Sequence, residues 1–180
     1  MNWMIITAAV ILGVIAVDQV SKVLVSELLY RKSVVLIPDV LDFTYVENRG
    51  MAFGLLEDHR WVFIVLSVVG LAAIGFYLFR YGKTWLTRIS LALILGGGVG
   101  NMIDRIRLGV VIDFIDFCAL PTVWVWVFNI ADAAVCVGAA LFILDLILDI
   151  VREMRAKKAA ATQASAAPDT EKTDDHGADS

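Results

Sequence analysis

Residues 61–79 form an uninterrupted apolar run, which constrains the fold more strongly than any other feature of the chain. The run has nineteen residues without a charge and is bracketed by Arg60 and Arg80. About 20 such residues cross the hydrocarbon core of a bilayer as a helix. Hydrophobic residues fill 59% of the 180 positions, more than a water-soluble domain of this length needs. The sequence therefore predicts a membrane protein.

Three further apolar segments are long enough to span but contain polar residues. They are residues 3–25 (with Asp18, Gln19 and Lys22), 85–105 (with Asn101 and Asp104) and 128–148 (with Asn129 and Asp132). The first lacks a basic start and a small-residue cleavage pattern before Asp18, so we expect it to be retained rather than removed as a signal peptide. The predicted fold is an all-α membrane protein of four transmembrane helices, with a small extracytoplasmic β-structure and an interfacial segment.

Basic residues predict the orientation of these spans. Three lie in or directly beside the short connection between the second and third spans, and four follow the fourth span: Arg80, Lys83 and Arg88, then Arg152, Arg155, Lys157 and Lys158. The positive-inside rule makes both segments cytoplasmic, with the N- and C-termini, and residues 26–60 external. At about 1.5 Å per residue, the polar residues of the first, third and fourth spans all fall in the outer half of the bilayer.

The segments outside the spans are expected to differ in order. Residues 34–56 alternate apolar and polar positions before the turn-forming Asn48-Arg49-Gly50, which predicts strands at the membrane surface. Residues 117–127, with Pro121, Trp124 and Trp126, are typical of an interfacial connection. Residues 156–180 are polar and simple in composition, so we expect a four-helix domain at 1–155 and a disordered cytoplasmic tail.

Two aspartates stand in strongly apolar surroundings. Asp113 lies in VVIDFIDF and Asp132 in FNIADAAV. A buried carboxylate is costly unless it is paired or functional. If the two approach within a few ångströms, they share one proton and can activate water against a carbonyl carbon, as aspartic proteases do. Asn101 and Asn129 could then orient the pair or hold substrate amides.

Each polar pattern also has a structural interpretation. Asp18 and Lys22, spaced i and i+4, could be an ion pair that ends a helix at the headgroups. Asp132 could pair with Arg105 or Lys22 from another helix. The glycines at 96–98 and 100 could serve helix packing, site-building or both. The two cysteines and two histidines are scattered, so we expect no metal site, no cofactor and no nucleic-acid partner.

Five segments together resemble the ordered motifs of the lipoprotein signal peptidases, the bacterial type II signal peptidases. They are DQVSK (18–22), ENRGMAFG (47–54), GGGVGNMIDR (96–105), VVIDF (110–114) and FNIAD (128–132). The resemblance implies an aspartic endopeptidase of the bacterial inner membrane that removes signal peptides from diacylglyceryl-modified prolipoproteins, cutting before the lipidated cysteine.

The resemblance also implies roles for individual positions. Asp113 and Asp132 match the catalytic pair. Seven further residues match positions that shape the site or bind substrate: Asp18, Lys22, Asn48, Gly50, Asn101, Arg105 and Asn129. Similar proteins are inhibited by the cyclic peptide globomycin. The expected partners are lipid-modified prolipoproteins and membrane lipids, and the expected state is a monomer.

Two other classes of protein compete with this hypothesis. A small proton-coupled transporter could use Asp132 and Asp18 as a relay, although transport sites usually lie near the midplane and often within repeated topologies. Here the polar residues are one-sided and the sequence shows no repeat. A non-enzymatic scaffold would tolerate Asp113→Asn and Asp132→Asn.

Overall fold

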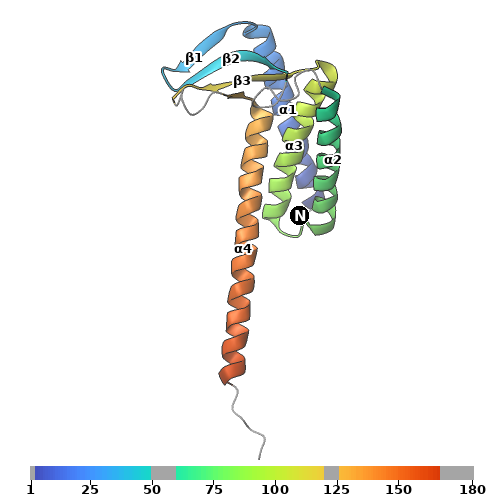
Figure 1. Cartoon of the computed structure of the whole chain (residues 1–180), viewed down its shortest axis with the longest axis vertical. Helices are drawn as coiled ribbons and strands as arrows, with labels where there is room; N and C mark the ends of the chain where they lie inside the picture. Colours follow the sequence, from blue (N-terminus) through green and yellow to red (C-terminus); the bar gives the residue numbers. More distant parts are fainter. Residues whose placement is uncertain (1–2, 50–59, 120–125, 167–180) are drawn as a thin grey trace, which may run out of the picture. The chain divides into compact units, whose positions relative to one another are not determined.

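Four long helices account for most of the chain (Figure 1). The computed structural model describes residues 3–49, 60–119 and 126–166. In it, α1 spans Trp3–Leu28, α2 Arg60–Tyr81, α3 Trp85–Arg107 and α4 Ile130–Ala166. Each helix is long and apolar enough to cross a membrane. The predicted fold class is confirmed.

The last helix is longer than expected. The chain divides into two compact units, residues 1–143 and 144–180, and the part of α4 in the second unit continues to Ala166. The prediction that disorder begins at residue 156 is therefore wrong for residues 156–166. These residues are rich in alanine, the best helix former, and a Glu153–Lys157 ion pair at 2.9 Å links one turn to the next. Residues 167–180 lie outside the described part, and the division into domain and tail stays a prediction.

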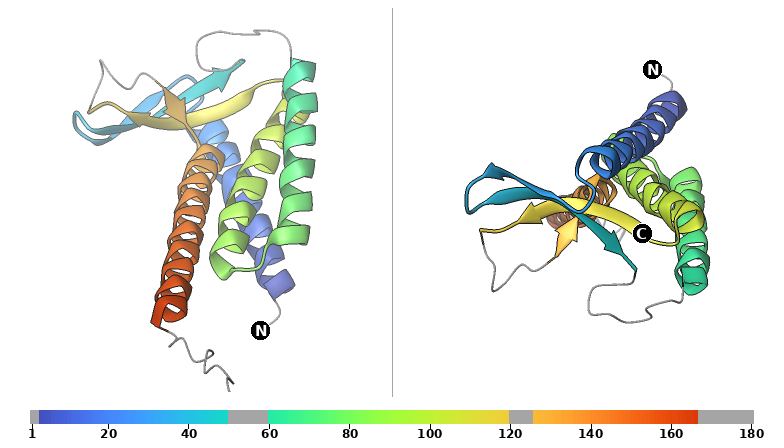
Figure 2. Two further views of the ribbon diagram at one scale, coloured as in Figure 1. Left: turned by 60° about the horizontal axis from the view of Figure 1, so that its bottom comes forward. Right: turned by 90° about the horizontal axis from the view of Figure 1, so that it is seen from above.

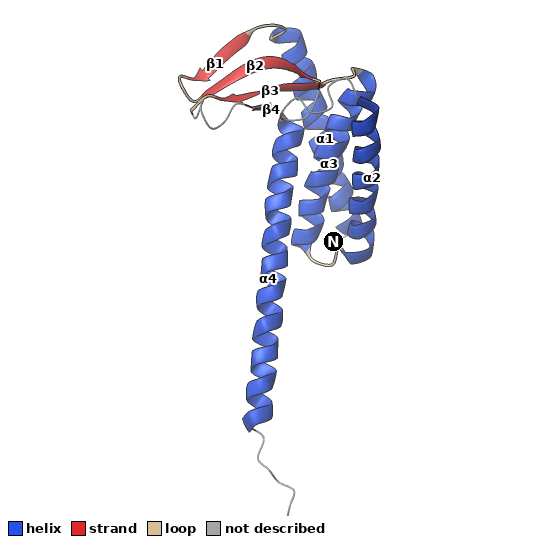
Figure 3. Ribbon diagram, in the orientation of Figure 1, coloured by secondary structure: helices blue, strands red, loops and turns tan. Residues whose placement is uncertain are grey.

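A small antiparallel sheet completes the first unit (Figure 3). Its strands are β1 (Ser33–Ile37), β2 (Leu41–Asn48), β3 (Val111–Phe117) and β4 (Val127–Phe128), in the order β1-β2-β3-β4. The first two confirm the strands expected before Asn48 and are joined by a turn in which Asp39 has φ 59°. The third was not predicted as a strand. Of the expected interfacial segment, Pro121 and Trp124 lie outside the described residues, and Trp126 is exposed.

The sheet lies across the end of the helices where α1 ends and α4 begins, and the N-terminus of α1 lies at the opposite end (Figure 2). The first four residues of β3 are all buried. Phe114 packs edge-on against Phe43 of β2, with ring centroids 5.6 Å apart. This buried strand brings Asp113 to the junction between the sheet and the helix ends.

The glycines of α3 allow two other elements to approach its backbone. A Cβ atom on Gly97 would collide with the carbonyl oxygen of Ala131 in α4. A Cβ atom on Gly100 would lie 2.5 Å from Oδ2 of Asp18 in α1. Any side chain at either position would push these elements apart. The glycine run therefore serves both packing and the construction of a polar site.

Candidate active site

Asp113 is held in place by two amide groups. Its Oδ2 accepts a hydrogen bond from Asn48 Nδ2 at 2.8 Å, and its Oδ1 accepts one from Asn129 Nδ2 at 2.6 Å. In the antiparallel register Asn48 lies opposite Val111, so its side chain lies diagonal to Asp113 on the same face. Asp113 is 2% exposed, as its apolar surroundings predicted.

Burial shifts the titration of this carboxyl. The pKa of Asp113 is raised to about 6, mainly by desolvation and in smaller part by the negative charge of Asp132. The hydrogen bonds from Asn48 and Asn129 lower the pKa, as does the positive charge of Lys22. Because desolvation is the largest of these effects, Asp113 keeps its proton to a much higher pH than an exposed aspartate does.

Asp132 lies in the first turn of α4, where it forms a reciprocal cap with Asn129. The Asp132 backbone N–H donates to Asn129 Oδ1 at 2.9 Å, and the Asn129 N–H donates to Asp132 Oδ2 at 3.3 Å. This is a capping box in which asparagine and aspartate replace the usual serine and glutamate. The helix dipole also favours a negative charge at this end. The cap fixes both side chains relative to the helix axis.

Asn101 on α3 joins the two aspartates into one network. Its Nδ2 donates to Asp132 Oδ1 at 2.7 Å, and its Oδ1 accepts from Asn129 Nδ2 at 3.1 Å and from Lys22 Nζ at 2.9 Å. An ammonium group has no acceptor, so it must face the amide oxygen of Asn101. Lys22 therefore fixes which way this amide points, and so aims its N–H at Asp132.

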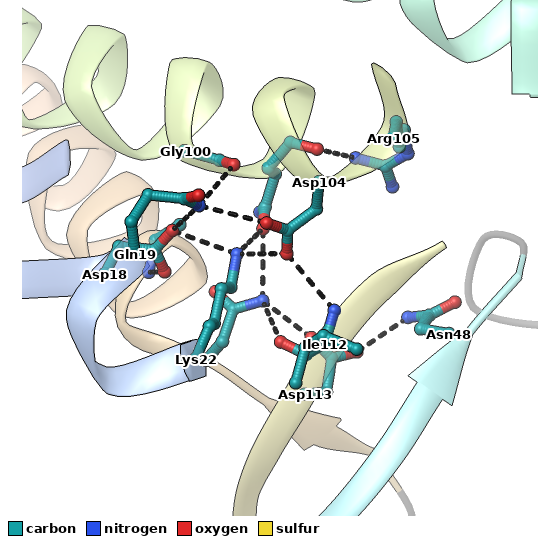
Figure 4. A network of polar contacts seen from close by, with 12 residues as sticks. Asp18, Gln19, Lys22, Asn48, Gly100, Asp104, Arg105, Ile112 and Asp113 are labelled. Atoms are coloured by element: carbon teal, nitrogen blue, oxygen red, sulfur yellow. Dashed lines mark hydrogen bonds and ion pairs between the residues drawn. The ribbon is translucent and has the colours of Figure 1, made fainter. Parts of the chain in front are cut away.

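Lys22 is the centre of a buried charge cluster, the lysine triad of Asp18, Lys22 and Asp104 (Figure 4). Its Nζ lies 2.9 Å from Asp18 Oδ2 and 2.9 Å from Asp104 Oδ2. All three side chains are at most 4% exposed. The bond to Asn101 is the third polar contact of the ammonium. Asp18 and Lys22 are thus an ion pair as well as part of the site, so neither interpretation excludes the other.

The surplus carboxylate oxygens of the lysine triad hold the backbone around it. Asp18 Oδ1 accepts from the Ala131 N–H in the first turn of α4 at 3.0 Å, and Asp104 Oδ2 accepts from the Ile112 N–H of β3 at 3.2 Å. Gln19 Nε2 donates to Asp104 Oδ1 at 2.9 Å. Each backbone contact lies one residue from a member of the aspartate pair. The lysine triad therefore fixes the segments that carry Asp113 and Asp132.

The structure brings eight of the nine predicted site residues into this region. Arg105 is half-buried, and its Nη1 donates to the Asn101 carbonyl oxygen at 3.4 Å. Its charge interacts with those of Asp132, Asp113 and Asp104. Gly50, the ninth, lies outside the described residues.

Sequence reasoning did not include Asp104 and Gln19 in the site. Asp104 lies beside Arg105 in the sequence, whereas the structure pairs Asp104 with Lys22 of another helix. The available signal was its spacing, because Asp104 follows Asn101 by three positions and shares its helix face. For Gln19, the one signal in the sequence was its position next to the predicted site residue Asp18.

The fold and the site define a polytopic membrane enzyme of the aspartic peptidase class. The family model described as signal peptidase (SPase) II matches residues 10–148. The chain therefore belongs to the signal peptidase II family.

Individual relatives agree with this assignment. The lipoprotein signal peptidase of Halothermothrix orenii is 45% identical over 138 residues, which cover 76% of this chain and 92% of that protein. That of Clostridioides difficile is 41% identical over 131 residues, covering 72% and 86%. A bacterial membrane enzyme solved by the in meso method at 2.3 Å resolution superposes with a TM-score of 0.74 at 28% identity, covering 80% of this chain and 88% of that one.

Proposed function

We propose that this signal peptidase II cleaves diacylglyceryl-modified prolipoproteins immediately before the lipidated cysteine, with Asp113 and Asp132 as its catalytic pair. The observation that carries the proposal is the amide bridge between the two carboxylates. Asn129 Nδ2 donates to Asp113 Oδ1 and to Asn101 Oδ1, and Asn101 Nδ2 donates to Asp132 Oδ1. Such a bridge keeps two acidic groups in one site in a fixed mutual orientation.

The two aspartates divide the proton-transfer work. Asp113, whose pKa is raised to about 6, supplies the proton, and Asp132 at the positive end of α4 acts as the base. Asp132 takes a proton from water as the water oxygen attacks the scissile carbonyl carbon. Asp113 gives its proton to the carbonyl oxygen, so the tetrahedral intermediate is neutral. Asp132 then protonates the leaving amine as the C–N bond breaks, and Asp113 recovers its proton from the intermediate's hydroxyl.

The surrounding residues hold this geometry. Asn48 and Asn129 keep the Asp113 carboxyl in one rotamer, and Asn101, aimed by Lys22, does the same for Asp132. Pre-positioned groups of this kind remove most of the ordering entropy from the reaction. Arg105 offers a positive charge to the substrate backbone or to the two carboxylates. Gly50 would let the external segment come close to substrate.

The place of the site suits a lipid-modified substrate. Acyl chains stay in the bilayer, so the peptide bond beside a lipidated cysteine is presented at the membrane boundary. Asp113 belongs to β3 and Asp132 to the first turn of α4, and these elements meet at the end of the helices covered by the sheet (Figure 1). In this proposal that end lies at the outer membrane boundary. The basic residues at the other ends of the spans support a multi-pass protein of the bacterial inner membrane with cytoplasmic termini and the site in the outer leaflet.

A gradient-free cleavage assay tests the proposed function. The purified full-length chain in neutral detergent is given a synthetic signal peptide with a diacylglyceryl cysteine, and the products are sequenced by mass spectrometry. We expect one cut before the modified cysteine, inhibition by globomycin, and the same rate per molecule at all dilutions, as for a monomer. Uptake of protons by vesicles with no cleavage would instead support the transporter hypothesis.

A further inference from the structure

A second concave site lies at the end of the helices away from the aspartate pair. This α1–α2 groove has a volume of about 280 Å³. Its lining includes Ala8 and Ile11 of α1, Gly75 and Leu78 of α2, and Arg88 of α3. Arg88 precedes Asn101 by thirteen residues on α3, which is roughly 20 Å along the helix axis. The groove is therefore separate from the site described above.

The groove is almost wholly apolar, and part of its lining is exposed. Two of its lining side chains, Met4 and Phe79, are 68% and 85% exposed. Gly75 contributes an open wall, because a Cβ atom added there would have no atom within 4 Å apart from its own helix backbone and chain neighbours. Among the described residues that line it, Thr7 is the one polar side chain besides Arg88, and its hydroxyl donates to the Trp3 carbonyl oxygen at 2.8 Å. For helices that span a bilayer, a slot of this kind faces lipid chains rather than water.

Arg88 puts a positive charge at this apolar slot without an acidic neighbour in the sequence. No Asp or Glu occurs between Asp58 and Asp104, whereas Arg80 and Lys83 lie in the same stretch. Arg88 also stands in the first turn of α3, where the helix dipole disfavours a cation. An anion beside Arg88 would relieve both effects.

We propose that the α1–α2 groove binds one anionic glycerophospholipid, with an acyl chain in the slot and the phosphate on Arg88. Basic residues beside clefts between membrane helices are typical sites for anionic headgroups. The apolar slot favours a lipid over free phosphate, which would use only the guanidinium. The groove also favours a lipid over a second copy of the protein. It offers one positive charge at one end of an apolar slot, which matches one phosphate attached to an acyl chain. This site is independent of the proposed peptidase function.

Native mass spectrometry of the full-length protein in neutral detergent tests the proposal. Phosphatidylglycerol, phosphatidylcholine with the same chains, and inorganic phosphate are titrated separately. We expect one phosphatidylglycerol per protein, with affinity at least about fivefold above that of phosphatidylcholine. Arg88→Gln should remove this preference, and Gly75→Leu should weaken the binding of both lipids by filling the slot.

Two matched variants separate the groove from general surface charge. Lys83→Gln removes a cation from the connection between α2 and α3, five residues before Arg88, where its side chain is exposed. Gly70→Leu adds the same bulk to α2 at a position outside the groove that also faces open space. Both should bind lipid as the parent protein does. Equal losses in Arg88→Gln and Lys83→Gln, equal affinity for both lipids, tight binding of phosphate alone, or a change of oligomeric state in Gly75→Leu with unchanged lipid binding would each overturn the proposal.

Discussion

The hydrogen bond from Asn48 to Asp113 offers a quantitative test of the catalytic assignment. Among the groups that lower the pKa of Asp113, Asn48 has the largest effect, while desolvation is the main cause of the net rise to about 6. If catalysis requires the protonated carboxyl, kcat/KM should fall tenfold per pH unit above about 6. Asn48→Ala removes a donor that stabilises the charged form more than the neutral form. The alkaline limb of the profile should therefore move to higher pH.

The size of the shift follows from the strength of that bond. A hydrogen bond to a charged acceptor contributes about 1.5–3 kcal/mol, which corresponds to about 1–2 pKa units at 1.36 kcal/mol per unit. Taking the lower figure, the protonated fraction at pH 7 rises from about one tenth to about one half. Relative to its own acidic plateau, kcat/KM of the variant at pH 7 should then rise about fivefold.

The assay is cleavage of the lipidated peptide from about pH 4.5 to 9 under kcat/KM conditions. Arg49→Gln is the matched control, because it changes a charge on the adjacent residue whose side chain is 67% exposed and 3.8 Å from Glu47. Exposed charges interact weakly, so the alkaline limb of the Arg49→Gln profile should move by no more than a few tenths of a pH unit. An unmoved limb in Asn48→Ala, or one displaced to lower pH, would refute the role of Asp113 as the proton donor.

Further predictions concern the groups that hold the site. Lys22→Met leaves Asp18 and Asp104 buried without their cation, so we expect a loss of about 3–5 kcal/mol in unfolding free energy, measured by denaturation in detergent; stability equal to the parent would contradict this. Gly100→Ala places a methyl group 2.5 Å from Asp18 Oδ2 and should lower both Tm and kcat, whereas Gly13→Ala, in open space, should lower neither. Equal effects of the two alanines would show that helix propensity, and not crowding of Asp18, governs the response.

The spans were predictable because bilayer thickness sets a length that hydropathy reveals directly. The cap at the start of α4 was harder to predict from the sequence. Asn129 and Asp132 were expected inside a span beginning near residue 128, whereas the structure uses their three-residue spacing to start α4. The apolar run and the capping pattern predict the same helix. The cap alone explains why the side chains of Asn129 and Asp132 face one site.

Non-local pairing explains what the sequence concealed. The strand β3 was an apolar connection in the sequence, since its partner β2 lies more than sixty residues earlier and strand register is not encoded locally. The partner of Lys22 was ambiguous for the same reason, because helix spacing identified Asp18 but not Asp104 on α3. The length of α4 was underestimated because polar composition was taken as disorder although alanine favours helix.

The most direct test of the central claim is the turnover of Asp113→Asn and Asp132→Asn, compared with Asp149→Asn. Asp149 is an exposed aspartate paired with Arg152 at 2.9 Å, so its variant controls for the loss of one carboxylate. With the parent's thermal unfolding profile retained, we expect each of the first two to lose at least about a thousandfold in kcat/KM, and the third to match the parent. Cleavage by either folded variant within tenfold of the parent would contradict the assignment of Asp113 and Asp132 as the catalytic pair.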